Sequence, residues 1–266
     1  MCCKYNLNST QEFRTDLKKL SKNLIFFLTL IYSIQSWSAE VLIAVAANFA
    51  GPVNKISAAF EKDTGNKVNI SIGSTGKFYT QIKHGGPYEV LLAADDETPA
   101  KLVNEGFADP ESRFTYATGK LVLWSKQNSL VDDKGEILKA GVFNHLAIAD
   151  PKFAPYGLAA METLVQLGLD KVITPKAVWG ENIGQTYLFV ESQSAELGFV
   201  ALSQIYTDGH IREGSAWIVP EFMHTPIKQD AVLLSVGKKN SVARDFLAYL
   251  RGKKARDIIK SYGYDL

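Results

Sequence analysis

The sequence predicts an α/β protein built on two sheets. Short apolar runs that fit buried strands alternate with segments of helical periodicity through residues 41–262, which is typical of strand and helix units packed on largely parallel sheets. The pattern begins at residue 41 and starts again at residue 121, so we expect two mostly parallel sheets, each flanked by helices. The 266 residues are 46% hydrophobic and 21% charged, as in globular domains.

The N-terminal residues have the pattern of a secretory signal peptide. Residues 24–34 form the one long apolar run, lysines precede it, and Ser36-Trp37-Ser38-Ala39 follows it. Small residues after an apolar segment are typical of a signal peptidase site. We therefore predict a signal peptide over residues 1–38, cleaved between Ser38 and Ala39. The alternative, a membrane anchor, is disfavoured because a spanning helix needs about 20 apolar residues.

The first part of residues 39–266 contains three predicted strands, each followed by a predicted helix. Apolar or alternating runs predict strands at 41–46, 67–72 and 90–94. Apolar residues three or four positions apart predict the helices, and glycines mark their ends. The first is capped by Asn48 and ends near Gly65, the second carries Phe78 and Ile82, and Thr98-Pro99 opens the third.

The same alternation continues in the second part of the chain. Further strands are predicted at 121–124, 146–149, 199–202, 217–219 and 231–236, and further helices at 156–167, 183–191, 241–250 and 254–262. Two segments, 116–119 and 224–227, are the predicted crossings between the sheets. Both are short enough to act as hinges between two lobes.

Composition and motifs exclude several classes of function. The net charge of +1 gives no bulk attraction for nucleic acid. Both cysteines, Cys2 and Cys3, lie in the predicted signal peptide, so the exported protein would contain no disulfide and no thiolate nucleophile or metal ligand. The sequence contains no GxSxG or P-loop motif, and its four histidines lack the spacing of metal ligands.

Hydrogen-bond donors recur where a predicted strand ends and the next helix starts. These positions are Asn48, Ser74-Thr75-Gly76, Pro155-Tyr156-Gly157 and Glu181-Asn182-Ile183. Helix N-termini carry unpaired N–H groups and about half a positive charge each, so several of them meeting at one point would form an anion site. Taken singly, each is better explained as an ordinary helix cap. Only their convergence in space would separate the two interpretations.

Three carboxylates suggest an alternative site. Asp95 and Asp96 follow the third predicted strand, and Asp150 follows another strand, so they could bind a metal ion or act as an acid and base pair. They also fit exposed loops that lead into helices, where acidic residues are favourable. An exported metal-dependent hydrolase is therefore the alternative function of another class.

A series of short motifs occurs in order along residues 40–265. They are Val45-Ala46-Ala47-Asn48-Phe49, Gly73-Ser74-Thr75-Gly76-Lys77, Gly85-Gly86-Pro87, Leu92-Ala93-Ala94-Asp95-Asp96, Ala149-Asp150-Pro151, Ala154-Pro155-Tyr156-Gly157, Leu197-Gly198-Phe199-Val200-Ala201 and Tyr262-Gly263-Tyr264. The ordered set resembles the periplasmic molybdate-binding proteins of ABC-type importers. This resemblance implies a type II periplasmic-binding-protein fold, in which two hinged lobes enclose a tetrahedral dianion.

The resemblance also implies a set of ligand-binding residues. Asn48, with Ala47 beside it, lies where the family has a donor pair in the first loop, and Thr75, with Ser74, lies where a hydroxyl and an N–H group contact the oxyanion. Tyr156 and Ile183 match positions whose backbone N–H groups point at the ligand. The chain departs from the family in having Asn48 for the commoner serine and Ala201 for a tyrosine. Tyr156, where many members have alanine, would supply the missing phenolic hydroxyl.

The function implied is transport of molybdate, with tungstate as a second ligand, without catalysis and without a cofactor. The implied partner is an inner-membrane ABC permease, and the implied location is the periplasm. We expect a monomer whose lobe I comprises 39–117 and 228–266 and whose lobe II comprises 118–227. The same fold with another oxyanion, sulfate or phosphate, is the alternative ligand, and Asp95 or Asp150 would then accept the proton of phosphate.

Overall fold

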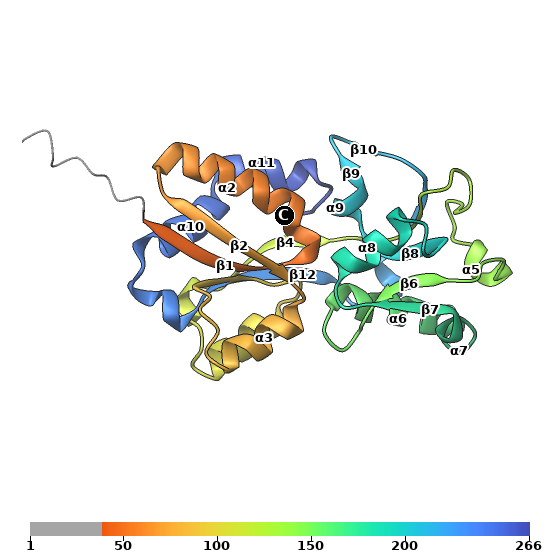
Figure 1. Cartoon of the computed structure of the whole chain (residues 1–266), viewed down its shortest axis with the longest axis horizontal. Coiled ribbons are helices and arrows are strands. Elements are labelled where there is room, and N and C mark those ends of the chain that lie inside the picture. Colours follow the sequence, from red (N-terminus) through yellow and green to blue (C-terminus); the bar gives the residue numbers. More distant parts are fainter. Residues whose placement is uncertain (1–38) are drawn as a thin grey trace, which may run out of the picture. The chain divides into compact units, whose positions relative to one another are not determined.

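The computed structural model describes residues 39–266, which contain two five-stranded sheets (Figure 1). The first sheet has the strand order β2 (Lys67–Gly73), β1 (Glu40–Ala46), β3 (Val90–Leu92), β12 (Ile227–Leu233) and β4 (Phe114–Gly119). The second has the order β11 (Ser215–Ile218), β5 (Leu121–Ser125), β8 (Leu197–Ala201), β6 (Leu146–Ala149) and β7 (Ala177–Gly180). The predicted signal peptide, residues 1–38, lies outside the described residues.

Each sheet is mixed, with one strand opposed to the others. In the first sheet β1 is parallel to β2 and β3, whereas β12 is antiparallel to β3 and β4. In the second, β6 is parallel to β7 and β8, whereas β5 is antiparallel to β8 and β11. The reversed strands are those by which the chain enters one sheet from the other: β5 follows β4 after Lys120, and β12 follows β11 after residues 219–226. Because each starts where the parallel strands end, each runs in the opposite direction.

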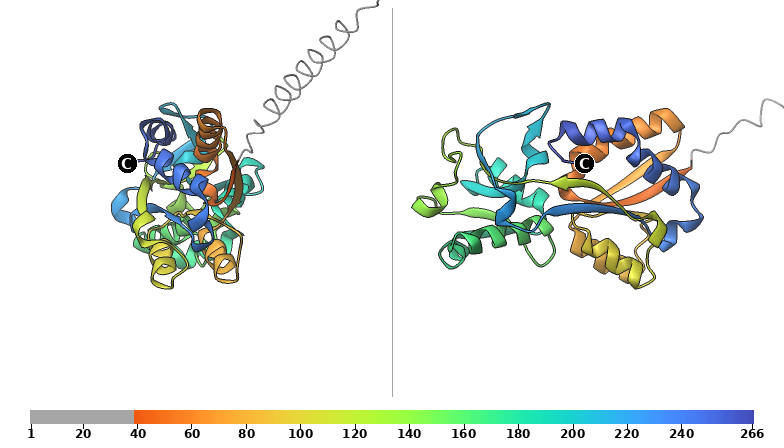
Figure 2. Two further views of the ribbon diagram at one scale, coloured as in Figure 1. Left: turned by 90° about the vertical axis from the view of Figure 1, so that its left-hand side faces the viewer. Right: turned by 180° about the vertical axis from the view of Figure 1, so that it is seen from behind.

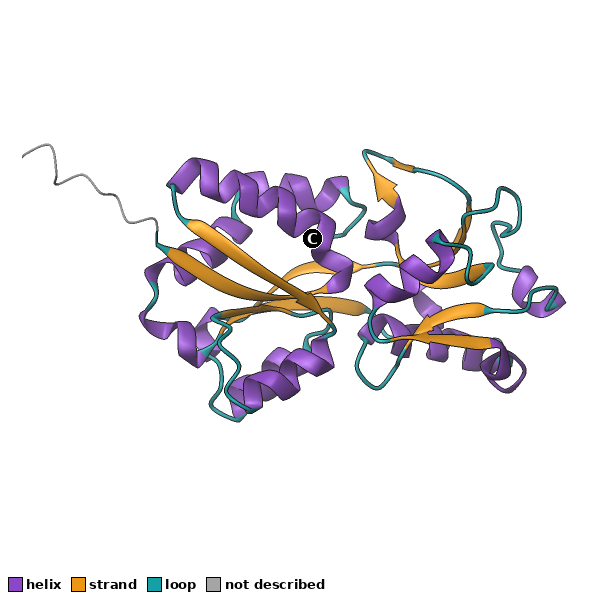
Figure 3. Cartoon of the chain, viewed as in Figure 1, coloured by secondary structure: helices purple, strands orange, loops and turns teal. Residues whose placement is uncertain are grey.

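Helices cover both faces of both sheets (Figures 2 and 3). The first sheet packs against α2 (Ala50–Thr64), α10 (Ser241–Arg251) and α11 (Lys253–Ser261) on one face and against α3 (Thr75–Lys83) and α4 (Glu97–Asn104) on the other. The second packs against α5 (Ile137–Ala140), α6 (Pro155–Gln166) and α7 (Asp170–Ile173) on one face and α8 (Ile183–Glu191) and α9 (Leu202–Ile205) on the other. None of the helices within residues 39–266 is both long and apolar enough to cross a membrane.

Most predicted elements are present, and the differences have local causes. Strand β7 was not predicted, because it is a short edge strand whose Trp179 is 41% exposed. The one-turn helices α5 and α7 and the two-residue strands β9 (Tyr206–Thr207) and β10 (His210–Ile211) are too short to show a periodicity. Strand β12 starts before the predicted residue 231, since Gln229 and Asp230 are polar yet buried.

Candidate anion-binding site

Four segments that follow carboxyl ends of parallel strands line one small cavity of about 10 Å³. They are the 3₁₀ turn η1 (Ala47–Phe49) after β1, the start of α3 after β2, the start of α6 beyond β6, and the start of α8 after β7. The lining residues are Ala46, Ala47, Asn48, Gly73, Ser74, Thr75, Ala94, Ala154, Pro155, Tyr156, Asn182 and Ile183. All six residues expected to bind the ligand are among them. The geometry thus supplies the convergence that sequence alone could not show, at the edge where α/β sheets bind ligands.

The starts of three helices leave backbone donors at this cavity. Thr75 and Ile183 are the first residues of α3 and α8, and Tyr156 follows Pro155 at the start of α6. Their N–H groups have no acceptor within their own helices, and no hydrogen bond from these groups is found among residues 39–266. Asn182 caps α8 by accepting from the N–H groups of Gly184 and Gln185, which leaves that of Ile183 unused.

Two hydroxyl groups add side-chain donors. Thr75 is buried, and its Oγ1 accepts a hydrogen bond of 2.9 Å from the N–H group of Ala94, so its own proton remains available. Ser74 is also buried, and its Oγ has no partner among the described residues. Within residues 39–266, no charged side chain lines the cavity. The site therefore offers hydroxyl and amide donors together with the positive ends of helix dipoles.

Asn48 does not cap α2 as predicted. It lies inside η1, and the N-cap of α2 is Phe49, which makes no side-chain cap bond. The Asn48 Nδ2 atom donates instead to Gln229 Oε1 at 2.8 Å and to the Tyr264 hydroxyl at 2.9 Å. Its Oδ1 is buried without a hydrogen-bond partner among the described residues. The side chain thus belongs to a polar network behind the cavity.

The hydroxyl of Tyr156 joins the same network. It accepts a hydrogen bond of 3.1 Å from Gln229 Nε2, which holds the phenol in the network while its own proton stays available to an acceptor. Burial raises the pKa of Tyr116 and Tyr156 well above the ordinary value and that of Tyr264 to about 12. All three phenols are therefore neutral at physiological pH, and the network adds no charge to the site.

Sequence reasoning missed the residues of this network: Tyr116, Ser203, Gln229 and Tyr264. Ser203 Oγ donates to the Asn48 carbonyl oxygen at 2.8 Å, and the Tyr264 hydroxyl is within 3.0 Å of the same oxygen. These residues are far apart in sequence, so no local pattern groups them. Two signals were available: Tyr264 belongs to one of the ordered motifs, and Gln229 is a polar residue close to the predicted strand at 231–236.

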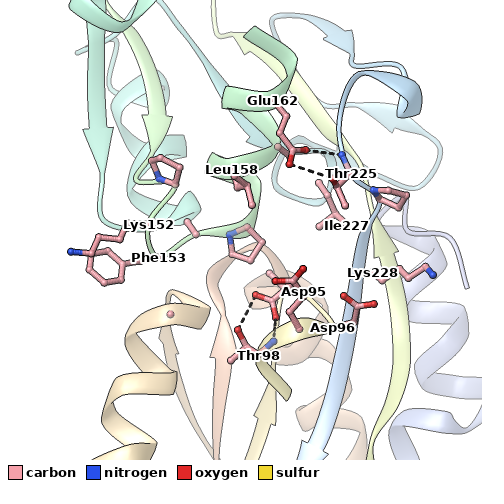
Figure 4. Close-up of a pocket in the computed structure, with 18 residues that line it drawn as sticks. Asp95, Asp96, Thr98, Lys152, Phe153, Leu158, Glu162, Thr225, Ile227 and Lys228 are labelled. Carbon is pink, nitrogen blue, oxygen red and sulfur yellow. Dashed lines mark hydrogen bonds between the residues drawn. The ribbon is translucent and has the colours of Figure 1, made fainter. Parts of the chain in front are cut away.

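The candidate carboxylates do not assemble into one site. Asp95 and Asp96 line a neighbouring pocket of about 170 Å³, and Figure 4 shows Glu162 across that pocket, where it accepts hydrogen bonds from Thr225. Asp95 accepts from the N–H group of Thr98 at 2.8 Å, and burial raises its pKa to about 6. Asp150 does not line this pocket. Residues 39–266 contain no group of three His, Cys, Asp or Glu side chains that could hold a metal ion, which removes the basis for the metal-dependent hydrolase.

Known proteins resemble this chain over most of its length. The model of a family described as bacterial extracellular solute-binding protein matches residues 41–265. Two relatives, each named molybdate-binding protein ModA, are 55% identical over 229 residues in Azotobacter vinelandii and 48% identical over 227 residues in Rhodobacter capsulatus. The alignments cover 86% and 85% of this chain and 91% and 88% of the relatives. The solved structure of the Azotobacter vinelandii periplasmic molybdate-binding protein is 43% identical, with a TM-score of 0.83, over 85% of this chain and 99% of that one.

Proposed function

The chain belongs to the family of bacterial extracellular solute-binding proteins, and from this membership we propose that it binds molybdate for delivery to an ABC importer. It is a binding protein and not an enzyme. The two relatives described above both carry the name of molybdate-binding proteins, at 55% and 48% identity. Tungstate, which has the same charge and tetrahedral shape, is the second ligand that we propose.

The observation that carries this proposal is the meeting of four helix or turn starts around one cavity without charged side chains. A molybdate dianion has only acceptor atoms, so N–H and O–H donors match it on every side. A buried lysine or arginine would add attraction at a desolvation cost of several kcal/mol. Neutral donors therefore bind the ion while leaving it exchangeable, as delivery to a transporter requires.

The cavity lining also bears on the choice among oxyanions. Phosphate is partly protonated at neutral pH, and a site for it needs an acceptor for that proton. Asp95 and Asp150, the acceptors considered above, are not among the lining residues. Sulfate has the charge of molybdate but shorter bonds, so we propose that cavity size disfavours it.

The finer features follow from the same premise. We propose that lobe I, 39–117 with 228–266, and lobe II, 118–227, close on the ion about the two crossings. We further propose export through the signal peptide of residues 1–38, a periplasmic monomer, and an inner-membrane ABC permease as the partner. The crossings beside β4 and before β12 support the hinge, because only these two connections join the sheets along the described chain.

Thermal unfolding of residues 39–266 with each of four oxyanions tests the ligand. A ligand at 100 times its Kd stabilises the folded state by about 2.7 kcal/mol, which raises Tm by roughly 5–10 °C for a chain of this size. Molybdate and tungstate should each produce this shift at matched ionic strength, whereas sulfate and phosphate should not. An equal shift with sulfate or phosphate would refute the size selection, and no shift with molybdate would refute the proposal.

A further inference from the structure

Gln229 connects two of the cavity-lining residues from behind. Its side chain is fully buried on β12. The Oε1 atom accepts from Asn48 Nδ2 at 2.8 Å, and the Nε2 atom donates to the Tyr156 hydroxyl at 3.1 Å. Asn48 lies in the loop after β1 of the first sheet, and Tyr156 lies at the start of α6 beside the second. One side chain therefore contacts both halves of the site.

The hydrogen bonds of this network are poorly matched to its donors. Asn48 uses Nδ2 toward Gln229 and Tyr264, and its buried Oδ1 has no partner among the described residues. The single hydroxyl proton of Tyr116 lies within reach of two acceptors, the Ala93 carbonyl oxygen at 2.9 Å and Gln229 Oε1 at 3.0 Å. One proton cannot serve both well, and a buried polar atom without a partner costs stability. An oxyanion near Asn48 Oδ1 would also meet an acceptor.

A half-turn of the two amide groups gives Asn48 Oδ1 two donors and leaves the Tyr116 proton a single acceptor. It takes the Tyr264 proton away from the Asn48 carbonyl oxygen and from Ser203 Oγ, each 3.0 Å away. Gln229 Nε2 then donates to Asn48 Oδ1 and to the Tyr116 hydroxyl, whose proton goes to Ala93 alone. The Tyr264 hydroxyl donates to Asn48 Oδ1, and the Tyr156 hydroxyl donates to Gln229 Oε1. The atom of Asn48 that had no partner becomes Nδ2, a donor. These exchanges follow from the donor and acceptor inventory of amides and phenols.

We propose that Gln229 is a positioning residue, which holds Asn48 with its Nδ2 directed at the bound oxyanion. This inference rests on the proposed function, because it assumes that the cavity holds an anion. The direction of the Asn48 amide then contributes to selectivity: Nδ2 favours a fully deprotonated dianion, whereas Oδ1 would favour an ion that carries a proton, such as hydrogen phosphate.

A double-mutant cycle separates this role from a structural one. Gln229→Met keeps the side-chain length but removes both polar atoms, and we expect it to raise the molybdate Kd about tenfold in calorimetry. If Gln229 acts through Asn48, the same substitution should add less than twofold in an Asn48→Ala background. In a Tyr156→Phe background it should keep its tenfold effect. Equal effects of Gln229→Met in all backgrounds would show a general packing role and overturn the inference.

Two further measurements distinguish a failure of the Gln229 role from misfolding of a variant and from a failure of the proposed function. The Tm of each ligand-free variant reports whether it folds, and wild-type calorimetry with molybdate tests the proposed function independently. Nuclear magnetic resonance of wild-type protein carrying ¹⁵N-labelled asparagine, with Asn48→Ala for assignment, observes the Asn48 amide without altering Gln229. Molybdate should shift this NH₂ signal strongly. Tight molybdate binding with an unshifted signal would overturn the role of Gln229 and leave the proposed function standing.

Discussion

Thr75 links the first sheet to the cavity through a single hydroxyl group. The Thr75 Oγ1 atom accepts a hydrogen bond from the N–H group of Ala94, two residues after the end of β3. The hydroxyl proton of Thr75 therefore remains for a ligand. Thr75→Ala should therefore raise the molybdate Kd between about tenfold and a hundredfold, since a hydrogen bond to a charged group is worth about 1.5–3 kcal/mol. Calorimetric titration measures this change.

Two matched variants serve as controls for Thr75→Ala. Thr75→Ser keeps the hydroxyl and should stay within about threefold of the wild-type Kd. Tyr156→Phe should also stay within about threefold, because Tyr156 offers its backbone N–H to the cavity while its hydroxyl bonds Gln229. A large loss with Tyr156→Phe alone would assign the ligand contact to the phenol.

Asp95 makes stability depend on pH without belonging to the site. Burial raises its pKa from 3.8 to about 6, so the unfolded chain releases this proton at lower pH than the folded protein. The free energy of unfolding consequently falls as pH rises from about 4 to about 6 and is then level. Asp95→Asn should stabilise the protein by up to about 3 kcal/mol at pH 8 and by little at pH 4.

Urea unfolding at the two pH values measures this difference. Asp133→Asn, which alters an exposed acid in a loop of the second part of the chain, is the control and should change neither value. Equal stabilisation by Asp95→Asn at pH 4 and pH 8 would show that a cause other than ionisation operates.

The residues of the site divide into those that a sequence can reveal and those that it cannot. Thr75, Tyr156 and Ile183 were found because a strand, a loop and a helix start follow one another locally. Gln229 and Asn48 are 181 positions apart, and they meet only after β12 has crossed back into the first sheet. No periodicity encodes such a pairing, so the network behind the cavity had to be read from the structure.

At the scale of elements, the first turn of α3 crosses closely over the loop before α6. The Gly76 N–H group donates to the Phe153 carbonyl oxygen at 2.9 Å, and a Cβ atom at Gly76 would lie 2.9 Å from Phe153 Cα. Gly76→Ala should therefore hold the two segments apart and raise the molybdate Kd at least tenfold. The ligand-free Tm should change little or fall, because the helix preference of alanine over glycine, up to about 1 kcal/mol, opposes the cost of displacing the Phe153 backbone. An unchanged Kd would contradict this role of the glycine.

An ion pair connects helix α3, beside the first sheet, with the loop before α8, beside the second sheet. Lys77 Nζ, on α3, lies 2.8 Å from a carboxylate oxygen of Glu181, just before α8. Both side chains are substantially exposed, so the pair should be worth less than about 1 kcal/mol. We expect Lys77→Met to raise the dissociation rate of molybdate two- to fivefold at low salt and less at high salt, as stopped-flow measurement would show.

Helix α3 supplies its own control for this prediction. Lys83, near the other end of the helix, pairs with Glu105 at 2.9 Å, and both belong to the part of the chain around the first sheet. Lys83→Met removes the same charge from the same helix but breaks no contact with the α6 or α8 segments. Equal effects of the two substitutions would assign the change to net charge rather than to the bridge.

The limits of prediction at this scale follow from burial. Strands β1, β2 and β3 were predicted because their apolar or alternating residues pack directly into the core. The predicted start of strand β12 was too late, because Asp230 looks like a loop residue in the sequence. In the folded protein its buried carboxylate accepts hydrogen bonds from Arg113 at 2.6 Å and from Thr115 at 2.7 Å. Polar residues that are buried by tertiary partners look like loop residues in a sequence.

At the scale of the whole described molecule, the order of strands places the site. The parallel strands of both sheets end at the cavity, and the chain passes between the sheets at the same edge, after β4 and before β12. Donors from segments around each sheet thus line one cavity, and on the proposed function an ion bound there would favour the closed arrangement of the two lobes. The α/β class and the two sheets were predictable from the alternation of apolar runs and helical segments. The meeting of the four loops at one cavity depends on how the strands are ordered in the folded protein.

A crystal of residues 39–266 grown with tungstate would show where the oxyanion binds, because tungsten can be located by its anomalous scattering. We expect one strong peak in the cavity, with the ion's oxygens within hydrogen-bond distance of the N–H groups of Thr75, Tyr156 and Ile183. A peak in the pocket beside Asp95, or no peak in the cavity although tungstate raises the Tm, would contradict this expectation.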